Sequence, residues 1–281
     1  MLQLFLGAVI ISFSAVFVKL AQVSSGASAF YRALFGAAAL AAALTIGRGW
    51  KTFNLKLVLG GLACGLFFCF DLWSWHASIH YIGPGQATVL GNFQVFFLTL
   101  AAVVFTRTRP RPMFLLALFL ALSGLYLMVG MGWGAQTPQY RTGVLLGLLT
   151  AVFYTLFLLT LKQTVSGTAG PTAVMTAVSL SAAAIMSLLM LANGDSFAIP
   201  DGKSLLVLLA YGVLCQGLGW FLISTGLRQA PAALAGLTLL LQPALSYVWD
   251  VVFFAKPVTP VELSGAMLAL AAIYLGSTKG R

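Results

Sequence analysis

The side chains that could do chemistry in this sequence are a few polar groups set inside long apolar runs. They are Asp71, His76, Asn92, Gln216 and Gln242, and the indoles of Trp73 and Trp220 lie near three of them in the chain. A polar group in hydrocarbon is costly unless it is paired, so these groups are expected to face a bundle interior or a wet cavity. Amides and indoles can hydrogen-bond a small solute, and Asp71 or His76 could carry a proton.

A helical wheel over residues 69 to 80 divides the candidates of that segment between two faces. One face carries Asp71, Ser74, Trp75 and Ser78, and the opposite face carries Cys69, Trp73, His76 and His80. Both faces cannot line one cavity. The internal repeat described below pairs Trp73 with Trp220, whose helix face also carries Gln216. We therefore predict that Trp73, His76, Gln216 and Trp220 bind substrate, and that Asp71 is packing support or a proton carrier.

Two polar stripes run along the segments 84 to 106 and 231 to 254. They consist of Thr88, Asn92, Phe96 and Thr99, and of Thr238, Gln242, Ser246 and Trp249. Such a stripe can bind a solute, or it can bond helices together, although interhelical amide bonds contribute only about 1 kcal/mol. We predict Asn92 and Gln242 as substrate ligands. Pro243 frees a backbone carbonyl, which favours a kink or a gate.

Arg32 lies beside Tyr31, about one turn inside the segment 28 to 47, and two interpretations of it are open. The guanidinium could extend along the helix to the outer headgroups. It could instead bind a substrate carboxylate, because its fork of donors matches carboxylate geometry. Phe17 belongs to a set of aromatic residues that could form an apolar wall of the site or simply a packing surface.

Composition requires a membrane around these residues. The chain has 281 residues, of which 60% are hydrophobic and 7% are charged, whereas soluble domains are about 25% charged. The formal net charge is +10, but the basic residues lie between apolar runs, which indicates topology and anionic headgroups and not nucleic acid. The three cysteines show no CxxC spacing, so neither a metal nor a cofactor is predicted.

Ten segments are long and apolar enough to span a bilayer. They cover residues 2 to 20, 28 to 47, 56 to 80, 84 to 106, 112 to 131, 140 to 162, 170 to 193, 203 to 228, 231 to 254 and 260 to 278. The first is interpreted as a membrane helix and not as a removable signal. With both termini cytoplasmic, the inside carries ten basic residues, namely Arg48, Lys51, Lys56, Arg107, Arg109, Arg111, Lys162, Arg228, Lys279 and Arg281. The outside carries five, namely Lys19, Arg32, Arg141, Lys203 and Lys256, so this orientation is favoured.

The two halves of the chain resemble each other. A shift of 147 pairs Trp73 with Trp220 and Pro84 with Pro231, and a shift of 148 pairs Gln94 with Gln242. We predict two five-helix repeats, over residues 1–132 and 139–281. Because five is odd, the second repeat enters the membrane from the opposite side, and such inverted repeats are a basis for alternating access around a midplane site.

These residues resemble a known family. Phe30-Tyr31-Arg32-Ala33, the prolines Pro84 and Pro231, and Gln242-Pro243 are similar to the EamA branch of the drug/metabolite transporter superfamily. Asp71-Leu72-Trp73-Ser74-Trp75-His76 is most similar to bacterial aromatic amino acid exporters of the YddG type. The resemblance implies an exporter of neutral or aromatic amino acids, or of related metabolites, in the cell inner membrane. A permease for other small amphipathic solutes is the alternative.

Other classes of function are disfavoured by particular residues. The segment 2 to 20 has no acid, which argues against proton-coupled antiport of lipophilic cations, and only Lys19 and Arg32 approach the membrane interior, which argues against phosphorylated substrates. No HExxH or GxSxG motif supports an enzyme, and Phe197 breaks the phosphate-loop pattern before Gly202-Lys203-Ser204. A channel would want a charged ring or a carbonyl filter. The expected partners are a small solute and the lipid bilayer, and the chain could be monomeric.

Overall fold

The computed structural model of the chain describes residues 2–106, 112–130, 133–165, 169–227, 238–239 and 241–278. Within these ranges the chain consists of helices joined by short turns, without a β-strand. The α-helices are α1 Leu2–Ser12, α2 Ser14–Leu20, α3 Ser25–Ile46, α4 Leu55–Ile82, α5 Pro84–Gly91, α6 Gln94–Thr106, α7 Pro112–Leu125, α8 Pro138–Val165, α9 Pro171–Asn193, α10 Gly202–Ala210, α11 Trp220–Leu227, α13 Leu241–Phe254 and α14 Pro260–Thr278. Short 3₁₀ turns form η1 Gly49–Thr52 and η3 Trp133–Ala135, and π-helical turns form η2 Tyr126–Gly130 and η4 Tyr211–Gly219.

These helices overlap the apolar runs that the sequence predicts as spans, and several begin or end a few residues beyond them. Among the described residues, six helical stretches are long and apolar enough to cross a membrane, namely Leu2–Leu20, Ser25–Ile46, Leu55–Ile82, Pro138–Leu161, Pro171–Asn193 and Gly202–Ile223. Leu115–Met128 and Pro260–Leu275 are shorter apolar helices. The protein is therefore a membrane protein with several apolar helices, and the count of ten spans stays a prediction. Pro231 and the basic residues Arg107, Arg109, Arg111, Arg228, Lys279 and Arg281 lie outside the described residues.

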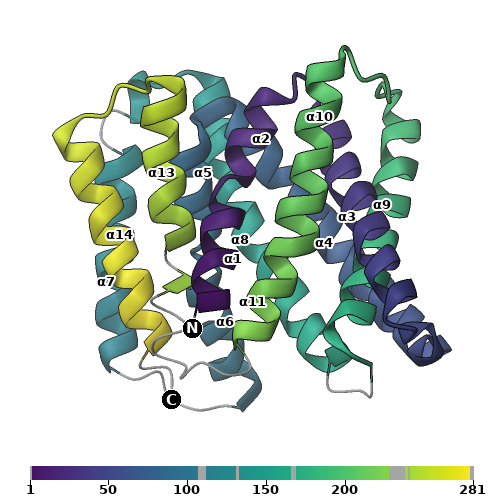
Figure 1. Cartoon of the computed structure of the whole chain (residues 1–281). Coiled ribbons are helices and arrows are strands. Elements are labelled where there is room, and N and C mark those ends of the chain that lie inside the picture. Colours follow the sequence, from purple (N-terminus) through teal and green to yellow (C-terminus); the bar gives the residue numbers. More distant parts are fainter. Residues whose placement is uncertain are drawn as a thin grey trace.

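Figure 1 shows the helices standing beside one another, with α7, α13 and α14 on one side, α3, α9 and α10 on the other, and α1 and α2 between them. We call the end at which α13 passes to α14 the upper end, and the opposite end the lower end. The connection from α9 to α10 also lies at the upper end, whereas α3 ends at the lower end (Figure 1). Residues of connections that are far apart in the sequence therefore lie at the same end of the bundle.

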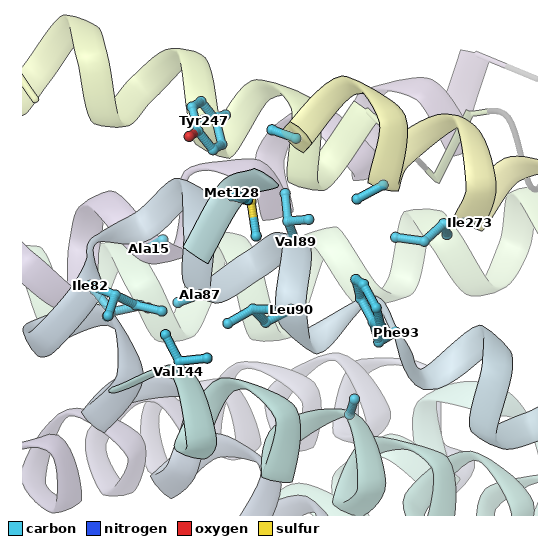
Figure 2. Close-up of a cluster of buried hydrophobic side chains, with 14 of the residues drawn as sticks. Ala15, Ile82, Ala87, Val89, Leu90, Phe93, Met128, Val144, Tyr247 and Ile273 are labelled. Carbon is cyan, nitrogen blue, oxygen red and sulfur yellow. The ribbon is translucent and has the colours of Figure 1, made fainter. Parts of the chain in front are cut away.

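Two apolar clusters flank the middle of the bundle. One fills the space between α5, α8, α13 and α14 and contains Leu90, Phe93 and Ile273 (Figure 2). The other joins α3, α4, α8 and α9 around Phe68 and Phe157, whose rings stack with centroids 4.8 Å apart. These clusters hold α4 and α8 in fixed rotations, which determines the side chains that face the space between the clusters.

Close backbone contact fixes α3 against η4. A Cβ atom built on Gly212 would lie 2.5 Å from Phe35 Cβ and 2.9 Å from the Gly36 nitrogen. Small residues allow membrane helices to approach this closely. The contact brings Arg32, one turn before Gly36, against the side chains of η4.

We expect Gly212→Ala to destabilise the protein by about 1–3 kcal/mol, because the added methyl group meets backbone that cannot move away. Gly202→Ala is the matched control, since a Cβ on Gly202 meets no atom within 4 Å. Thermal unfolding of the two detergent-solubilised variants measures the difference. Equal midpoints for both variants would show that α3 and η4 are not packed in this way.

Candidate functional site

A small cavity lies between the two apolar clusters. It has a volume of about 90 Å³ and is lined by residues of α1, α2, α3, α4, α5, α8, α11 and α13 and by Asn92, which follows α5. Its polar lining is Ser12, Ser14, Arg32, Asp71, Thr88, Asn92, Thr150, Gln242 and Ser246, and its aromatic lining is Phe68, Trp75, Tyr154 and Trp220. A space of this size holds a few water molecules. Sites for small ligands are usually about 300–1,000 Å³, so a solute would require this cavity to widen.

Arg32 is the cation in the wall of this cavity, and it is only 4% exposed. Its Nε donates to Gln216 Oε1 at 2.9 Å and its Nη1 donates to the Tyr211 hydroxyl at 2.7 Å. Among the described residues no carboxylate lies within ion-pair distance of Arg32. The side chain therefore does not extend to headgroups, and it stays a buried cation whose direct partners are neutral.

Neutral and aromatic groups hold the guanidinium in place. Its central carbon lies 5.0 Å from the ring centroid of Tyr211, 5.8 Å from that of Phe68 and 5.9 Å from that of Trp75, so cation–π attraction adds to the hydrogen bonds. His76 continues the network, with Nε2 3.0 Å from the Tyr211 hydroxyl. Its Nδ1 contacts the Leu72 carbonyl, and an Nδ1–H donor leaves Nε2 to accept the tyrosine proton.

Asp71 lies on the wall formed by α4 and is 7% exposed. Within the described part of the chain, its carboxylate has neither a hydrogen-bond donor nor a cation at ion-pair distance. The indole Nε1 of Trp220 is buried and has no hydrogen-bond partner there either. Buried polar groups normally have hydrogen-bond partners, and these two unpartnered groups belong to residues that line the same cavity. A bound solute is a natural partner for both.

The structure divides the predicted site residues into three groups. Arg32, Asp71, Asn92, Trp220 and Gln242 line the cavity. Behind the wall lie His76 and Gln216, both fully buried, and Phe17, whose ring packs 5.9 Å from that of Tyr211. Tyr31 and Trp73 lie elsewhere, since the Tyr31 hydroxyl donates to the Phe197 carbonyl at 2.6 Å in the α9 to α10 connection.

The choice between the two faces of α4 needs correction. Trp73 is 38% exposed and borders a separate hollow with Met186 and Asn193, whereas Asp71 and Trp75 face the central cavity. The helical wheel separates Asp71 from Trp73 as the structure does. The repeat pairing with Trp220, however, favoured the face of Trp73, which does not line the central cavity. Corresponding residues of two repeats need not face the same way once each helix packs against different neighbours.

Sequence reasoning missed several residues of the site. Trp75 was available as the i+4 neighbour of Asp71, on the face that was not chosen. Tyr211 carries no such signal, because a single tyrosine in an apolar run is typical of many membrane helices. Its position beneath Arg32 follows from the close approach of α3 and η4.

A second cluster of charges lies at the upper end. Asp250, fully buried at the end of α13, lies 4.0 Å from Lys19 and 3.7 Å from Lys256, and Lys256 lies 3.2 Å from Glu262. The backbone N–H of Gly85 donates to Asp250 at 3.2 Å. We call Lys19, Asp250, Lys256 and Glu262 the upper ionic cluster. It ties α2, α5, α13 and α14 together.

The sequence profile described as the EamA-like transporter family matches residues 1–130 and again residues 141–278. The chain belongs to the EamA-like transporter family. Its members are transporters and not enzymes, so this EamA-like chain is a membrane transporter. Curated protein sequences give no significant match.

Solved structures support the fold of this EamA-like transporter. One, described only as a crystal structure of a protein, superposes with a TM-score of 0.69 at 18% sequence identity. The match covers 98% of this chain and 94% of the other. At this identity the likeness concerns the fold alone.

Proposed function

We propose that this EamA-like transporter exports neutral or aromatic amino acids, or related zwitterionic metabolites, across the bacterial inner membrane by alternating access. The observation that carries the proposal is the pair Arg32 and Asp71. Both line one buried cavity, and they do not form an ion pair with each other. A zwitterion supplies a carboxylate for Arg32 and an ammonium group for Asp71.

The roles of the two charged residues follow from their chemistry. The Arg32 guanidinium binds the substrate carboxylate, for which it has unused donors. Asp71 accepts from the substrate ammonium group. Trp75, Tyr154 and Phe68 supply an apolar wall for the side chain. The amides of Asn92 and Gln242 and the Trp220 indole complete the polar contacts.

Alternating access is supported by the repeat and by the polar contacts that join helices toward the upper end. The family profile matches the chain twice, over stretches close to the proposed units 1–132 and 139–281. Ten spans in two inverted five-helix units would let each unit open one side in turn. The upper ionic cluster and the hydrogen-bonding distance of 3.0 Å between Thr88 and Ser246 join α5 to α13 on one side of the cavity.

The orientation that we propose places both termini in the cytoplasm and the upper end outside. Ten of the fifteen basic residues then lie inside, as the positive-inside rule favours. Export then delivers the substrate to the upper end. The transporter would act as a monomer, because the cavity is lined within one chain.

A competition assay tests the substrate class. The purified protein is reconstituted into liposomes, and flux of labelled tryptophan is measured. Unlabelled tryptophan, tryptamine and indole-3-propionate are added in turn as competitors. We expect tryptophan to compete about tenfold better than either analogue, because each analogue leaves one buried charge unpaired. The same panel with and without a proton gradient reports coupling.

The outcome also separates the proposal from the alternative. Equal competition by all three compounds would favour a permease for amphipathic solutes in general and would refute zwitterion recognition. Absence of flux for every amino acid in the panel would refute the amino acid class. Empty liposomes and liposomes with heat-unfolded protein are the controls for leakage.

A further inference from the structure

An apolar groove of about 600 Å³ runs along the outside of the bundle near the lower end. Its walls come from the second half of α3, the beginning of α9, and the stretch from η4 into α11. Ala39, Ala43, Gly47, Val213, Gly217 and Phe221 are among the residues that line it. Small residues on α3 and η4 keep it open, while Phe221 and Val213 are exposed along its edge.

The surroundings of the groove determine what can fill it. Its lining is almost entirely apolar, and the polar lining is limited to Thr52, Thr172 and backbone. Water finds too few partners in such a space, and an empty groove would forfeit dispersion contacts along its whole length. A flexible hydrocarbon chain fills it at low cost.

One end of the groove carries unpaired positive charge. Gly47, Gly49 and Thr52 line that end, and Arg48 and Lys51 belong to the same turn. Both cations are exposed, and neither has an ion-pair partner among the described residues. Trp50 next to them is 42% exposed, as is typical of side chains at the headgroup level.

None of the aspartate and glutamate side chains of the protein lies at this end. Its five acidic residues are Asp71, Asp195, Asp201, Asp250 and Glu262. Asp71 lies inside α4. Asp195 and Asp201 lie in the α9 to α10 connection, and Asp250 near the end of α13 and Glu262 in the first turn of α14 flank the other connection at the upper end (Figure 1). No acidic side chain therefore neutralises Arg48 or Lys51, and an anion from outside the chain can do so.

We propose that this groove is a binding site for an anionic phospholipid, with the phosphate between Arg48 and Lys51 and an acyl chain along α3. The combination of an apolar channel with a cationic end matches the two parts of such a lipid. A second copy of the chain suits the groove less well, because its equivalent face carries the same cations.

Native mass spectrometry of the full chain tests the site. The detergent-solubilised protein is titrated with dioleoylphosphatidylglycerol and, separately, with dioleoylphosphatidylcholine, and the bound lipid is counted. We expect the anionic lipid to bind more tightly, and Arg48→Gln or Lys51→Gln to weaken it about fivefold each, the usual effect of one cation near anionic headgroups. Lys203→Gln, an exposed cation at the upper end, is the matched control and should change nothing.

A second pair of variants tests the acyl channel. Ala43→Phe fills the groove and should weaken both lipids, whereas Ala42→Phe, on the exposed neighbouring position outside the groove, should weaken neither. The proposal is overturned by equal binding of the two lipids, or by equal effects of Lys203→Gln and Arg48→Gln, which would indicate diffuse attraction. A dimer peak that Ala43→Phe abolishes would assign the groove to a second copy instead, and would also overturn the lipid site.

Discussion

Replacing Arg32 by glutamine is expected to slow tryptophan flux in proteoliposomes by about tenfold or more. Hydrogen bonds to a charged partner contribute about 1.5–3 kcal/mol, and the substrate carboxylate would lose the cation that lines the described cavity. The loss should raise KM more than it lowers the maximal rate, since the interaction is with the bound substrate. Tryptamine, which lacks the carboxylate, should become a better competitor relative to tryptophan.

The mirror variant completes this test. Asp71→Asn should leave the tryptophan ammonium unpaired and should improve the relative competition by indole-3-propionate, which lacks that group. The two variants therefore shift selectivity in opposite directions. A merely structural role of either residue would lower flux of all compounds equally.

Controls separate recognition from folding. Arg32 also holds Gln216 and Tyr211, so each variant must show the same elution profile and thermal midpoint as the parent protein. Trp73→Ala removes a large aromatic side chain from the other face of α4 and should leave flux unchanged. Unaltered tryptophan kinetics and unaltered selectivity in a folded Arg32→Gln protein would end the proposal that Arg32 binds substrate.

The second large effect concerns the upper ionic cluster. We expect Asp250→Asn combined with Glu262→Gln to raise the accessibility of the cavity from outside about tenfold. Lys19 and Lys256 are 29% and 19% exposed, so leaving them without their acids costs about 1–3 kcal/mol, and opening the upper end lets water solvate them. In the proposed orientation, the cluster would thus stabilise a state in which the outer end is closed.

Cysteine labelling in intact cells measures this accessibility. Cys64, Cys69 and Cys215 are first replaced by alanine, and Thr150→Cys is introduced on α8, where it faces the cavity without touching the cluster. The rate of modification by a membrane-impermeant thiol reagent is then compared with and without the cluster variants. Competition by substrate confirms that the labelled cysteine lies in the transport path.

Asp201 provides the control acid at the same end. It caps α10 by accepting from the Ser204 N–H at 2.6 Å, a contact that lowers its pKa, so it is charged at neutral pH. Asp201→Asn removes this charge and retains the capping oxygen. In this variant, the introduced cysteine at position 150 should be labelled at the parent rate. An increase as large as that of the cluster variants would mean that loss of any acidic residue at this end raises the accessibility of the cavity.

Much of the helical framework could be predicted from the sequence, because hydrocarbon imposes a local requirement. Each run of apolar residues such as 28 to 47 or 170 to 193 must satisfy its backbone within itself, and it does so as α3 and α9. The same requirement made Asn92, Gln242, Trp220 and Arg32 stand out, since polar groups are few in these runs. All four line the cavity.

Tertiary structure alone decided how those helices are rotated and which charges meet. Periodicity gives the angle between Asp71 and Trp73 on α4 but not the direction of the bundle axis, which depends on the packing of α4 against α8 and α9. The burial of Arg32 and its contact with Tyr211 depend on the close approach at Gly212, 180 residues further along the chain. The contact between Lys19 and Asp250 likewise joins helices far apart in the sequence. No local pattern relates the two residues, because their pairing depends on how α2 and α13 pack in space.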